Sequence, residues 1–213
     1  TAEFPIINCL DCEKRTIFTK CEHCNSLNTQ QQYIDYFTKK KYNSPETPKC
    51  RAYERRKYEL PKLSKNIRSN WEGEFPKLIK GVRETMNKFR YVEHPIKGVL
   101  RAKYSLRVNK DGTVRYDATE LGTTHFTPEE IGLSIKKAHK LGYTHDFKGK
   151  PLTEKTQLVE IFPQDIILPS ESSLGIESAG SVLKRVADFV DESLVNLYNL
   201  PAHYNIAIES DLI

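Results

Sequence analysis

Four cysteines near the start of the chain have the spacing of a metal site. Cys9 and Cys12 form one CxxC pair, Cys21 and Cys24 form a second, and eight residues separate the pairs. Two such turns can place four thiolates tetrahedrally around one zinc ion. Because four protein ligands leave no position for water, the predicted Zn²⁺ is structural. The alternative, two disulfides, is uncommon in the reducing interior of a cell.

His23 lies inside the second pair and could replace a cysteine, but with four thiolates available we expect it to face solvent. A short hairpin through Thr16–Thr19 is expected to join the pairs and give a small zinc ribbon over residues 1–27. This segment has few apolar residues, so metal binding and folding are expected to be one event. Cys50 lies outside the pattern and is interpreted as an ordinary thiol.

Residues 28–70 are predicted to form a short helix followed by a basic connector. The helix is expected over Thr29–Lys40, with Tyr33, Ile34 and Phe37 on one face. Lys39–Arg68 then carries 11 basic and 3 acidic side chains, within a chain of 213 residues and net charge +5. Localised positive charge is typical of a surface that binds a polyanion, although a solvated linker has the same composition.

Tyrosines alternate with basic residues in this connector. Tyr42, Tyr53 and Tyr58 could stack on the bases of single-stranded nucleic acid, or they could hold the loop against the rest of the protein. Both interpretations stay open. The basic candidates for contact with nucleic acid here are Arg55, Arg56 and Lys57.

A β-hairpin is predicted in the third segment, residues 71–213. Tyr104–Val108 and Thr113–Asp117 have strand character, and the Asp-Gly of Asn109–Gly112 is typical of a tight turn. Phosphate contacts by Lys and Arg fix the register of a nucleic acid without reading its sequence. The exposed positions of this hairpin are expected to carry five such side chains: Arg101, Lys103, Arg107, Lys110 and Arg115.

A capped helix is predicted to follow the hairpin. Thr127 is expected to be its N-cap, Pro128 its first residue, Glu130 the second half of a capping box, and Gly142 its end. The other elements expected are an amphipathic helix over Phe75–Phe89 with Trp71 as a packing anchor, buried strands over Leu158–Phe162 and Asp165–Leu168, and a long helix over Ser178–Asn199. The fold class is therefore α+β, a zinc ribbon followed by a mixed domain.

The residues give little support for an independent enzyme. His125 and His145, each preceded by threonine, have no adjacent nucleophile motif, and a lone histidine is more often structural. The sequence has no GxxxxGK[ST] and no GxGxxG. It also has no apolar run long enough to span a membrane, so a cytoplasmic protein is expected. The chain begins without Met and ends in an unfinished pattern, from which we expect an artificial boundary or a split gene.

A series of short segments resembles the large subunits of the archaeal D-family DNA polymerases. In order, these segments are GVLRAKY, NKDGTVRYDAT, THFTPEEIG, LGYTHD, GKPL and QLVEIFPQDIILP, within Lys97–Pro169, and the resemblance continues to Tyr204. It implies a replicative DNA polymerase as the parent enzyme, with a core built on double-psi β-barrels that these strands complete or pack beside. It also implies that Arg101, Lys103, Arg115, Thr124 and His125 line the approach to the active site, and that Asp117 pairs with one of the cations.

The catalytic carboxylates of that family are not expected in this chain. A polymerase needs carboxylates that hold Mg²⁺, and the family has them in an Asn-Ala-Asp-Phe-Asp-Gly-Asp motif. The nearest segment here is Ala-Asp-Phe-Val-Asp-Glu, whose Asp188 and Asp191 have a different spacing and are interpreted as a solvated helix face. Mg²⁺ therefore belongs to the parent enzyme, and this fragment alone is expected to be inactive.

The resulting hypothesis is a piece of a DNA-directed DNA polymerase that holds primer–template DNA and supports nucleotidyl transfer. Its expected partners are DNA, the rest of the large subunit and the small exonuclease subunit, with no membrane. One alternative is a stand-alone zinc-ribbon module that binds nucleic acid. A second is a scaffold that docks the exonuclease subunit.

Overall fold

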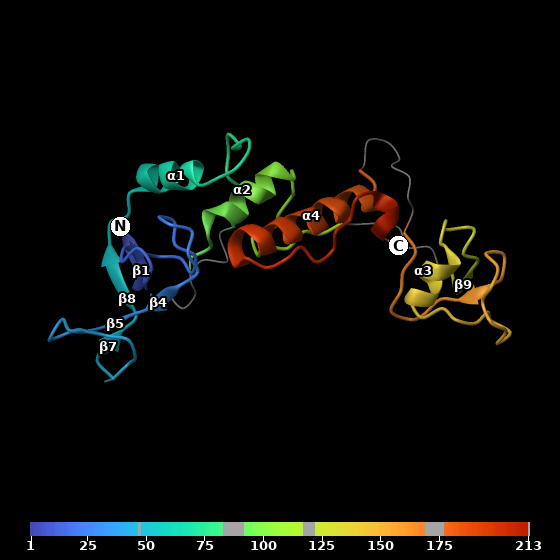
Figure 1. Cartoon of the computed structure of the whole chain (residues 1–213), viewed down its shortest axis with the longest axis horizontal. Helices are drawn as coiled ribbons and strands as arrows, with labels where there is room; N and C mark the ends of the chain where they lie inside the picture. The colour runs from blue at the N-terminus through green and yellow to red at the C-terminus, as the bar shows by residue number, and fades with distance from the viewer. Residues whose placement is uncertain (47, 83–91, 117–121, 169–176, 213) are drawn as a thin grey trace. The chain divides into compact units, whose positions relative to one another are not determined.

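The computed structural model describes residues 1–46, 48–82, 92–116, 122–168 and 177–212 (Figure 1). They divide into two compact units, residues 1–115 with 185–205, and residues 116–184 with 206–213. The helices are α1 (Leu60–Ser69), α2 (Pro95–Lys103), α3 (Ile135–Lys140), α4 (Ala179–Tyr198) and the 3-10 helix η1 (Glu209–Leu212). The strands are β1 (Ala2–Pro5), β2 (Ile7–Cys9), β3 (Arg15–Thr16), β4 (Thr29–Gln31), β5 (Tyr33–Asp35), β6 (Lys41–Tyr42), β7 (Cys50–Arg51), β8 (Tyr53–Arg56), β9 (His125–Phe126) and β10 (Val159–Glu160).

The α+β class is confirmed, and every sheet among the described residues is small and antiparallel. The first unit contains the sheets β1-β8, β3-β2-β4 and β6-β5-β7, and the second contains β10-β9. The predicted divisions after residues 27 and 70 do not coincide with the two units and stay predictions, as does the double-psi barrel. None of the described helices has the length and hydropathy needed to cross a membrane.

The helix predicted over Thr29–Lys40 is wrong, because strands β4 and β5 occupy that segment. Gln31 of β4 pairs with Ile7 of β2, and β5 pairs with both β6 and β7. Asp35 then reverses the chain, since its carboxylate accepts the N–H groups of Phe37 and Thr38 at 2.9 and 2.8 Å. Strand partners distant in sequence thus override the helical spacing of the apolar residues.

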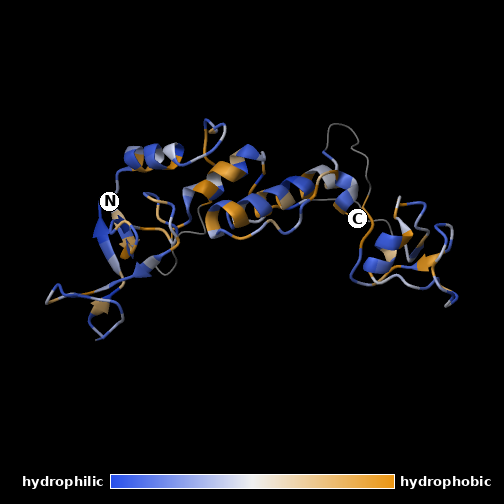
Figure 2. Cartoon of the chain, viewed as in Figure 1, coloured by the Kyte–Doolittle hydropathy of each residue, from blue (hydrophilic) through white to orange (hydrophobic). Residues whose placement is uncertain are grey.

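The core of the first unit joins the cysteine segment to the helices. It contains Ile17, Phe18, Leu63, Ile67, Ile96, Leu100 and Leu197, from the loop after β3 and from α1, α2 and α4. Trp71 packs against this cluster, as predicted for an anchor. Figure 2 shows more hydrophobic colour on α2 than on α1, and five residues of α2 are buried compared with two of α1.

The strand predicted over Tyr104–Val108 is wrong, and the whole of the preceding GVLRAK segment lies in helix α2. His94 caps this helix by accepting the N–H of Ile96 at 3.3 Å, and Pro95 lies in its first turn. The Asn109–Gly112 turn is confirmed: Asn109 donates its N–H to Thr113 O at 2.9 Å, and Gly112 has φ +88°. Its flanks form no strand in the described residues, which end at 116 here.

The helix predicted over Phe75–Phe89 is wrong through residue 82, and residues 83–91 lie outside the described part. A segment without regular secondary structure contacts α2 instead, where Lys80 N–H donates to Gly98 O at 3.1 Å. A Cβ on Gly98 would lie 2.3 Å from Ile79 Cγ2, so glycine permits this approach. Leu78, expected in the core, is 80% exposed, whereas Val82 is buried.

The long C-terminal helix is confirmed as α4. Ser178 caps it by accepting the N–H of Ser181 at 3.1 Å, and Asn199, with φ +52°, follows its last residue. Leu197 is buried as expected, but Leu183 is 47% exposed.

The second unit has its own core of Phe126, Leu133, Ala138, Tyr143, Leu152 and Val159. The capping pair is formed, since Thr127 N–H donates to Glu130 Oε2 at 2.7 Å and Glu130 N–H to Thr127 Oγ1 at 3.4 Å. The helix nevertheless begins later, at Ile135, because Gly132 turns the chain with φ +66°. Gly142, with φ +102°, follows the C-cap as predicted.

The two strands predicted near residue 160 are shorter or missing. Only Val159 and Glu160 form a strand, β10, which pairs with β9. Asp165–Leu168 is not a strand, and Ile166 is 65% exposed. Asp165 instead accepts the hydroxyl of Tyr143, whose ring stacks on Phe162 at 4.3 Å.

Candidate metal centre and nucleic-acid residues

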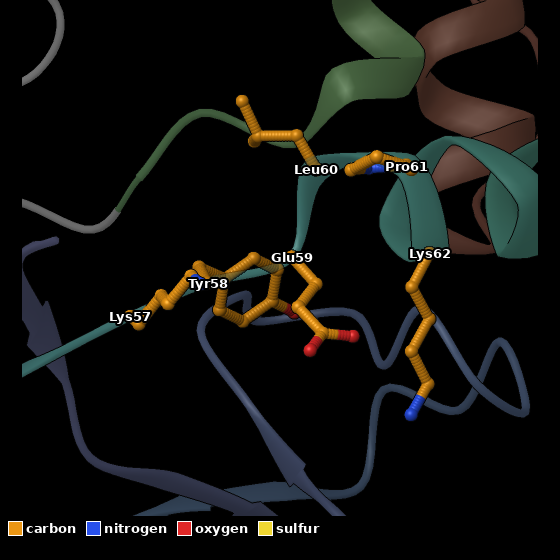
Figure 3. A pocket seen from close by; sticks show the side chains of 6 residues that line it. All are labelled: Lys57, Tyr58, Glu59, Leu60, Pro61 and Lys62. Carbon is orange, nitrogen blue, oxygen red and sulfur yellow. The ribbon is translucent and has the colours of Figure 1, made fainter.

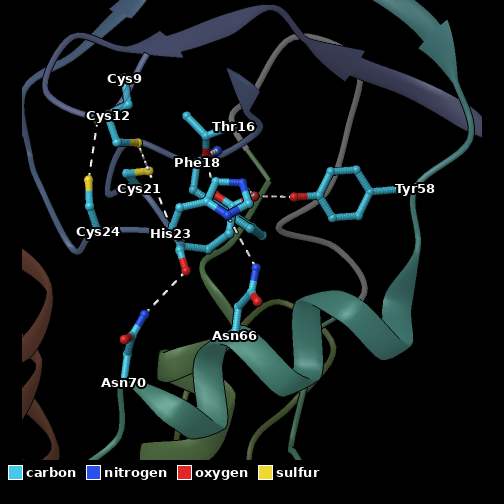
Figure 4. Close-up of polar contacts among 11 residues, drawn as sticks. Cys9, Cys12, Thr16, Phe18, Cys21, His23, Cys24, Tyr58, Asn66 and Asn70 are labelled. Atoms are coloured by element: carbon cyan, nitrogen blue, oxygen red, sulfur yellow. Dashed lines mark hydrogen bonds and ion pairs between the residues drawn. The ribbon is translucent and has the colours of Figure 1, made fainter. Parts of the chain in front are cut away.

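The four predicted cysteines form one cluster. Their Sγ atoms all lie within 4.8 Å of one another, with Cys9 and Cys24 at 3.5 Å and Cys12 and Cys21 at 3.6 Å (Figure 4). Tetrahedral zinc with Zn–S bonds of about 2.3 Å separates its sulfurs by about 3.8 Å, whereas a disulfide bond is about 2.05 Å long. The cluster therefore fits a four-coordinate metal.

Two matching turns position these thiols. Cys9 ends β2 and donates its N–H to Lys14 O at 3.0 Å, and Cys21 donates its N–H to Ser26 O at 2.8 Å. The residue after each CxxC pair has a left-handed backbone conformation: Glu13 has φ +57° and Asn25 has φ +58°. Local geometry of this kind depends on residues next to the ligands, which explains why spacing alone predicted the site.

The four thiols can all be deprotonated at the same time only if a cation is bound among them. Burial raises the pKa of Cys9, but hydrogen bonds with the backbone of Cys12 and Asp11 and with the side chains of Cys24 and Cys12 together outweigh it and lower the pKa to about 7. Burial raises the pKa of Cys21 above its usual range, and that of Cys24 is also raised. A bound Zn²⁺ replaces the thiol protons and offsets the repulsion among four thiolates.

A buried carboxylate next to the ligands was missed by sequence reasoning. The side chain of Glu22 is 1% exposed, and it accepts Thr16 Oγ1 at 2.5 Å and the hydroxyl of Tyr58. Asn70 Nδ2 donates to the backbone O of Glu22 at 3.3 Å. The partners lie up to 48 residues away, so no local pattern could indicate this network.

His23 was expected to face solvent, but it is mostly buried. Its side chain is 20% exposed, with Nδ1 at 3.2 Å from Asn66 Nδ2 of α1 and Nε2 at 3.6 Å from Glu22 Oε1. The described metal cluster contains cysteines alone. Figure 4 shows how these contacts tie the second cysteine turn to α1. For Tyr58, the network favours the role of holding the chain in place.

Arg101 does not occupy an exposed position, which corrects the sequence expectation. Its guanidinium forms two hydrogen bonds with Glu93, at 2.8 and 2.5 Å, and the two side chains are 8% and 14% exposed. It also lies 5.7 Å from the ring centroid of Phe189. This cation has a structural role inside the first unit.

The other cations near α2 differ in their surroundings. Arg107 and Lys110 are exposed. Lys103 pairs with Glu192 of α4, and Arg115 pairs with Asp111 at 2.9 Å. The predicted partner Asp117 lies outside the described residues.

The connector candidates lie at the end of β8, which contains Arg55 and Arg56, and just after it, at Lys57. Arg55 and Lys57 are exposed, whereas Arg56 lies 3.7 Å from Glu54 and 5.4 Å from the ring centroid of Tyr58. A pocket of about 550 Å³ lies where β8 leads into α1 (Figure 3). Lys57 and Lys62 both line it.

Thr124 and His125 belong to the second unit. Thr124 is exposed, its Oγ1 lies 3.0 Å from His125 Nδ1, and the His125 ring meets Phe147 edge-on at 5.9 Å. Of the carboxylates weighed as metal ligands, Asp191 is structural, because it accepts three backbone N–H groups at 2.8–2.9 Å from residues 203–205.

The chain matches a family model described as "DNA polymerase II large subunit DP2, catalytic domain" over residues 72–213. Three curated relatives carry the name DNA polymerase II large subunit. The protein of Archaeoglobus fulgidus is 39% identical over 99% of this chain and 18% of its own length. That of Nanoarchaeum equitans is 37% identical over 100% of this chain and 20% of its own length. That of Pyrococcus furiosus is 40% identical over 96% of this chain and 16% of its own length. The chain thus spans about a fifth or less of these relatives, and it belongs to the family of archaeal D-family DNA polymerase II large subunits.

Proposed function

We propose that this chain is part of the large subunit of a replicative DNA-directed DNA polymerase, in which it holds primer–template DNA and supports nucleotidyl transfer. The observation that carries the proposal is the match of residues 72–213 to the catalytic-domain model of the family. The chain also carries a net charge of +5, which favours binding to a polyanion.

The exposed cations are the proposed DNA contacts. Arg55, Lys57, Arg107 and Lys110 present charged groups to solvent and can pair with phosphates without reading sequence. Lys103 and Arg115 can exchange a surface carboxylate for a phosphate, since exposed ion pairs contribute little free energy. Arg56, Thr124 and His125 stay candidates, and Arg101 is omitted because it is buried against Glu93.

The proposed metal chemistry is divided between this chain and its parent. Cys9, Cys12, Cys21 and Cys24 would hold a structural Zn²⁺, which cross-links the two turns when bound. Mg²⁺ would act in the parent enzyme on carboxylates outside this chain, which lacks the family's catalytic motif. The proposed partners are DNA, the rest of the large subunit and the small exonuclease subunit.

A salt titration tests the proposal. The zinc-loaded chain is mixed with a labelled primer–template, and the dissociation constant is measured by anisotropy at several salt concentrations. Each phosphate contact contributes about −0.9 to the slope of log K against log salt, so Arg107→Ala with Lys110→Ala should flatten the slope by up to about 2. Lys136→Ala, at an exposed position of α3, is the matched control.

Two outcomes contradict the proposal. If the affinity for primer–template changes neither with salt concentration nor on Arg107→Ala with Lys110→Ala, the chain would better fit a scaffold that docks a protein partner. Mg²⁺-dependent primer extension by the pure chain would contradict its proposed dependence on the parent enzyme.

A further inference from the structure

Two adjacent aromatic side chains lie exposed in the turn after β5. Tyr36 is 52% exposed and Phe37 is 70% exposed. Their ring centroids are 5.5 Å apart and the rings are perpendicular. Neither residue belongs to the hydrophobic cluster of the first unit or packs against it. The fold therefore places a large apolar surface in water at this turn.

Cations cover the faces of these rings. Lys39 Nζ and Arg51 Cζ each lie 4.7 Å from the Tyr36 centroid, and Lys49 Nζ lies 5.0 Å from the Phe37 centroid. Residues 36–51 contain five basic residues and one acidic residue, Glu46. Flexible lysine side chains can leave a ring face when another group takes their place.

The backbone holds the two rings in place. Asp35 is 7% exposed, and its carboxylate accepts the N–H groups of Phe37 and Thr38, while its backbone O accepts the N–H of Lys39 at 3.0 Å. Strand β5 is the middle strand of the sheet β6-β5-β7. The rings are thus presented from a fixed turn, which lowers the entropy lost on binding.

We propose that this aromatic tip, defined as Tyr36, Phe37, Lys39, Lys49 and Arg51, binds unpaired nucleotides of single-stranded DNA. A base stacks on the Phe37 ring, and the displaced lysines pair with the flanking phosphates. Exposed aromatics among cations are the usual platform for unpaired bases, whose faces are covered in a duplex. Charge complementarity favours DNA, since the tip carries three cations, and residues 36–51 as a whole carry five cations and one acid, opposite a partner with one negative charge per nucleotide. The inference rests on the proposed DNA-holding function and adds an unpaired strand as its ligand.

Matched probes separate stacking from charge. Labelled oligothymidylate of 12 nucleotides is compared with an abasic strand of equal length, which keeps the phosphates and lacks the bases. Both are titrated by anisotropy with the full zinc-loaded chain. The wild type should bind oligothymidylate at least about fivefold more tightly, because stacking on an aromatic side chain typically strengthens binding about 5- to 150-fold per base.

Variants of Phe37 test whether the aromatic tip causes the difference in affinity between oligothymidylate and the abasic strand. Phe37→Ala and Phe37→Leu should abolish most of the preference for oligothymidylate. Their affinity for the abasic strand should stay within about twofold of the wild-type value. Phe37→Tyr should keep the preference. Tyr204→Ala, at a 51% exposed aromatic in the same unit, is the control that should change neither affinity.

Parallel measurements with primer–template duplex distinguish the two proposals. Normal duplex binding together with equal affinity for oligothymidylate and abasic strand would overturn the stacking platform and leave the DNA-holding function intact. A preference that Phe37→Leu does not reduce would also overturn it. A wild-type chain that binds neither the primer–template duplex nor the single strand would overturn both proposals.

Discussion

Replacing Arg101 should destabilise the first unit rather than simply weaken DNA binding. Its guanidinium donates from Nη1 to Glu93 Oε2 at 2.8 Å and from Nη2 to Glu93 Oε1 at 2.5 Å, and Nη1 also donates to Lys80 O at 3.3 Å. Arg101→Ala removes the cation and leaves the Glu93 carboxylate, 14% exposed, without this partner. Burying an unpaired charge is unfavourable because water no longer solvates it.

The expected magnitude is large. Breaking a buried ion pair by removing one partner typically costs about 3–5 kcal/mol, which is a substantial share of the 5–15 kcal/mol that stabilises most domains. Glu93→Gln should also destabilise, because it removes the charge that Arg101 faces. Arg101→Met combined with Glu93→Leu should recover much of the loss, since a buried pair replaced by apolar side chains is often nearly neutral.

Urea unfolding followed by tryptophan fluorescence measures this effect. Trp71 is the one tryptophan of the sequence, and it packs against the core of the first unit, so its emission reports on that unit. With a slope of about 2 kcal/mol per molar urea, Arg101→Ala should lower the midpoint by roughly 1.5–2.5 M. Lys110→Ala, an exposed cation nearby, is the matched control and should change stability by less than about 0.5 kcal/mol.

DNA binding provides the refuting result. If Arg101→Ala unfolds at the same urea concentration as the wild type and yet weakens binding to primer–template, the structural assignment is wrong. A Glu93→Gln variant with unchanged stability would contradict the reasoning in the same way.

Three further predictions follow from the metal cluster, from a buried histidine and from the core. The chain should bind one zinc ion by elemental analysis; Cys12→Ser should lose it and lower the thermal midpoint, whereas Cys50→Ser, outside the cluster, should keep it. Burial and two nearby lysines lower the pKa of His94 to about 4 from an unfolded value of about 6.5, so only the unfolded state gains a proton as pH falls between these values. Stability should therefore drop by up to about 3 kcal/mol from pH 6.5 to 4, and His94→Asn should lack this part of the pH dependence in urea titrations. Leu100→Ala, at a fully buried site, should cost about 2–5 kcal/mol in the same assay, whereas Leu78→Ala, 80% exposed, should cost under 0.5 kcal/mol; equal costs would contradict the core assignment.

The sequence by itself determined the features whose causes are local. The CxxC pairs predicted the metal cluster because each pair lies on one tight turn, and the turns need only neighbouring residues. The helix α4 was predicted because its 20 residues repeat one apolar pattern between a Ser178 cap and Asn199. The ordered motifs within Lys97–Pro169 indicated the family for the same reason, since they are read directly from the chain.

Tertiary structure decided what depends on distant partners. Residues 29–35 have helical spacing but form strands, because β2, β6 and β7 supply the hydrogen bonds. The Arg101 side chain could not be assigned to the surface or the interior from its neighbours, since Glu93 and Phe189 come from other segments and bury it. Glu22 contacts residues up to 48 positions away from it, so its role emerges only when the cysteine turn packs on α1. Local chemistry is fixed by adjacent residues, whereas burial and pairing are fixed by which segments the fold brings together.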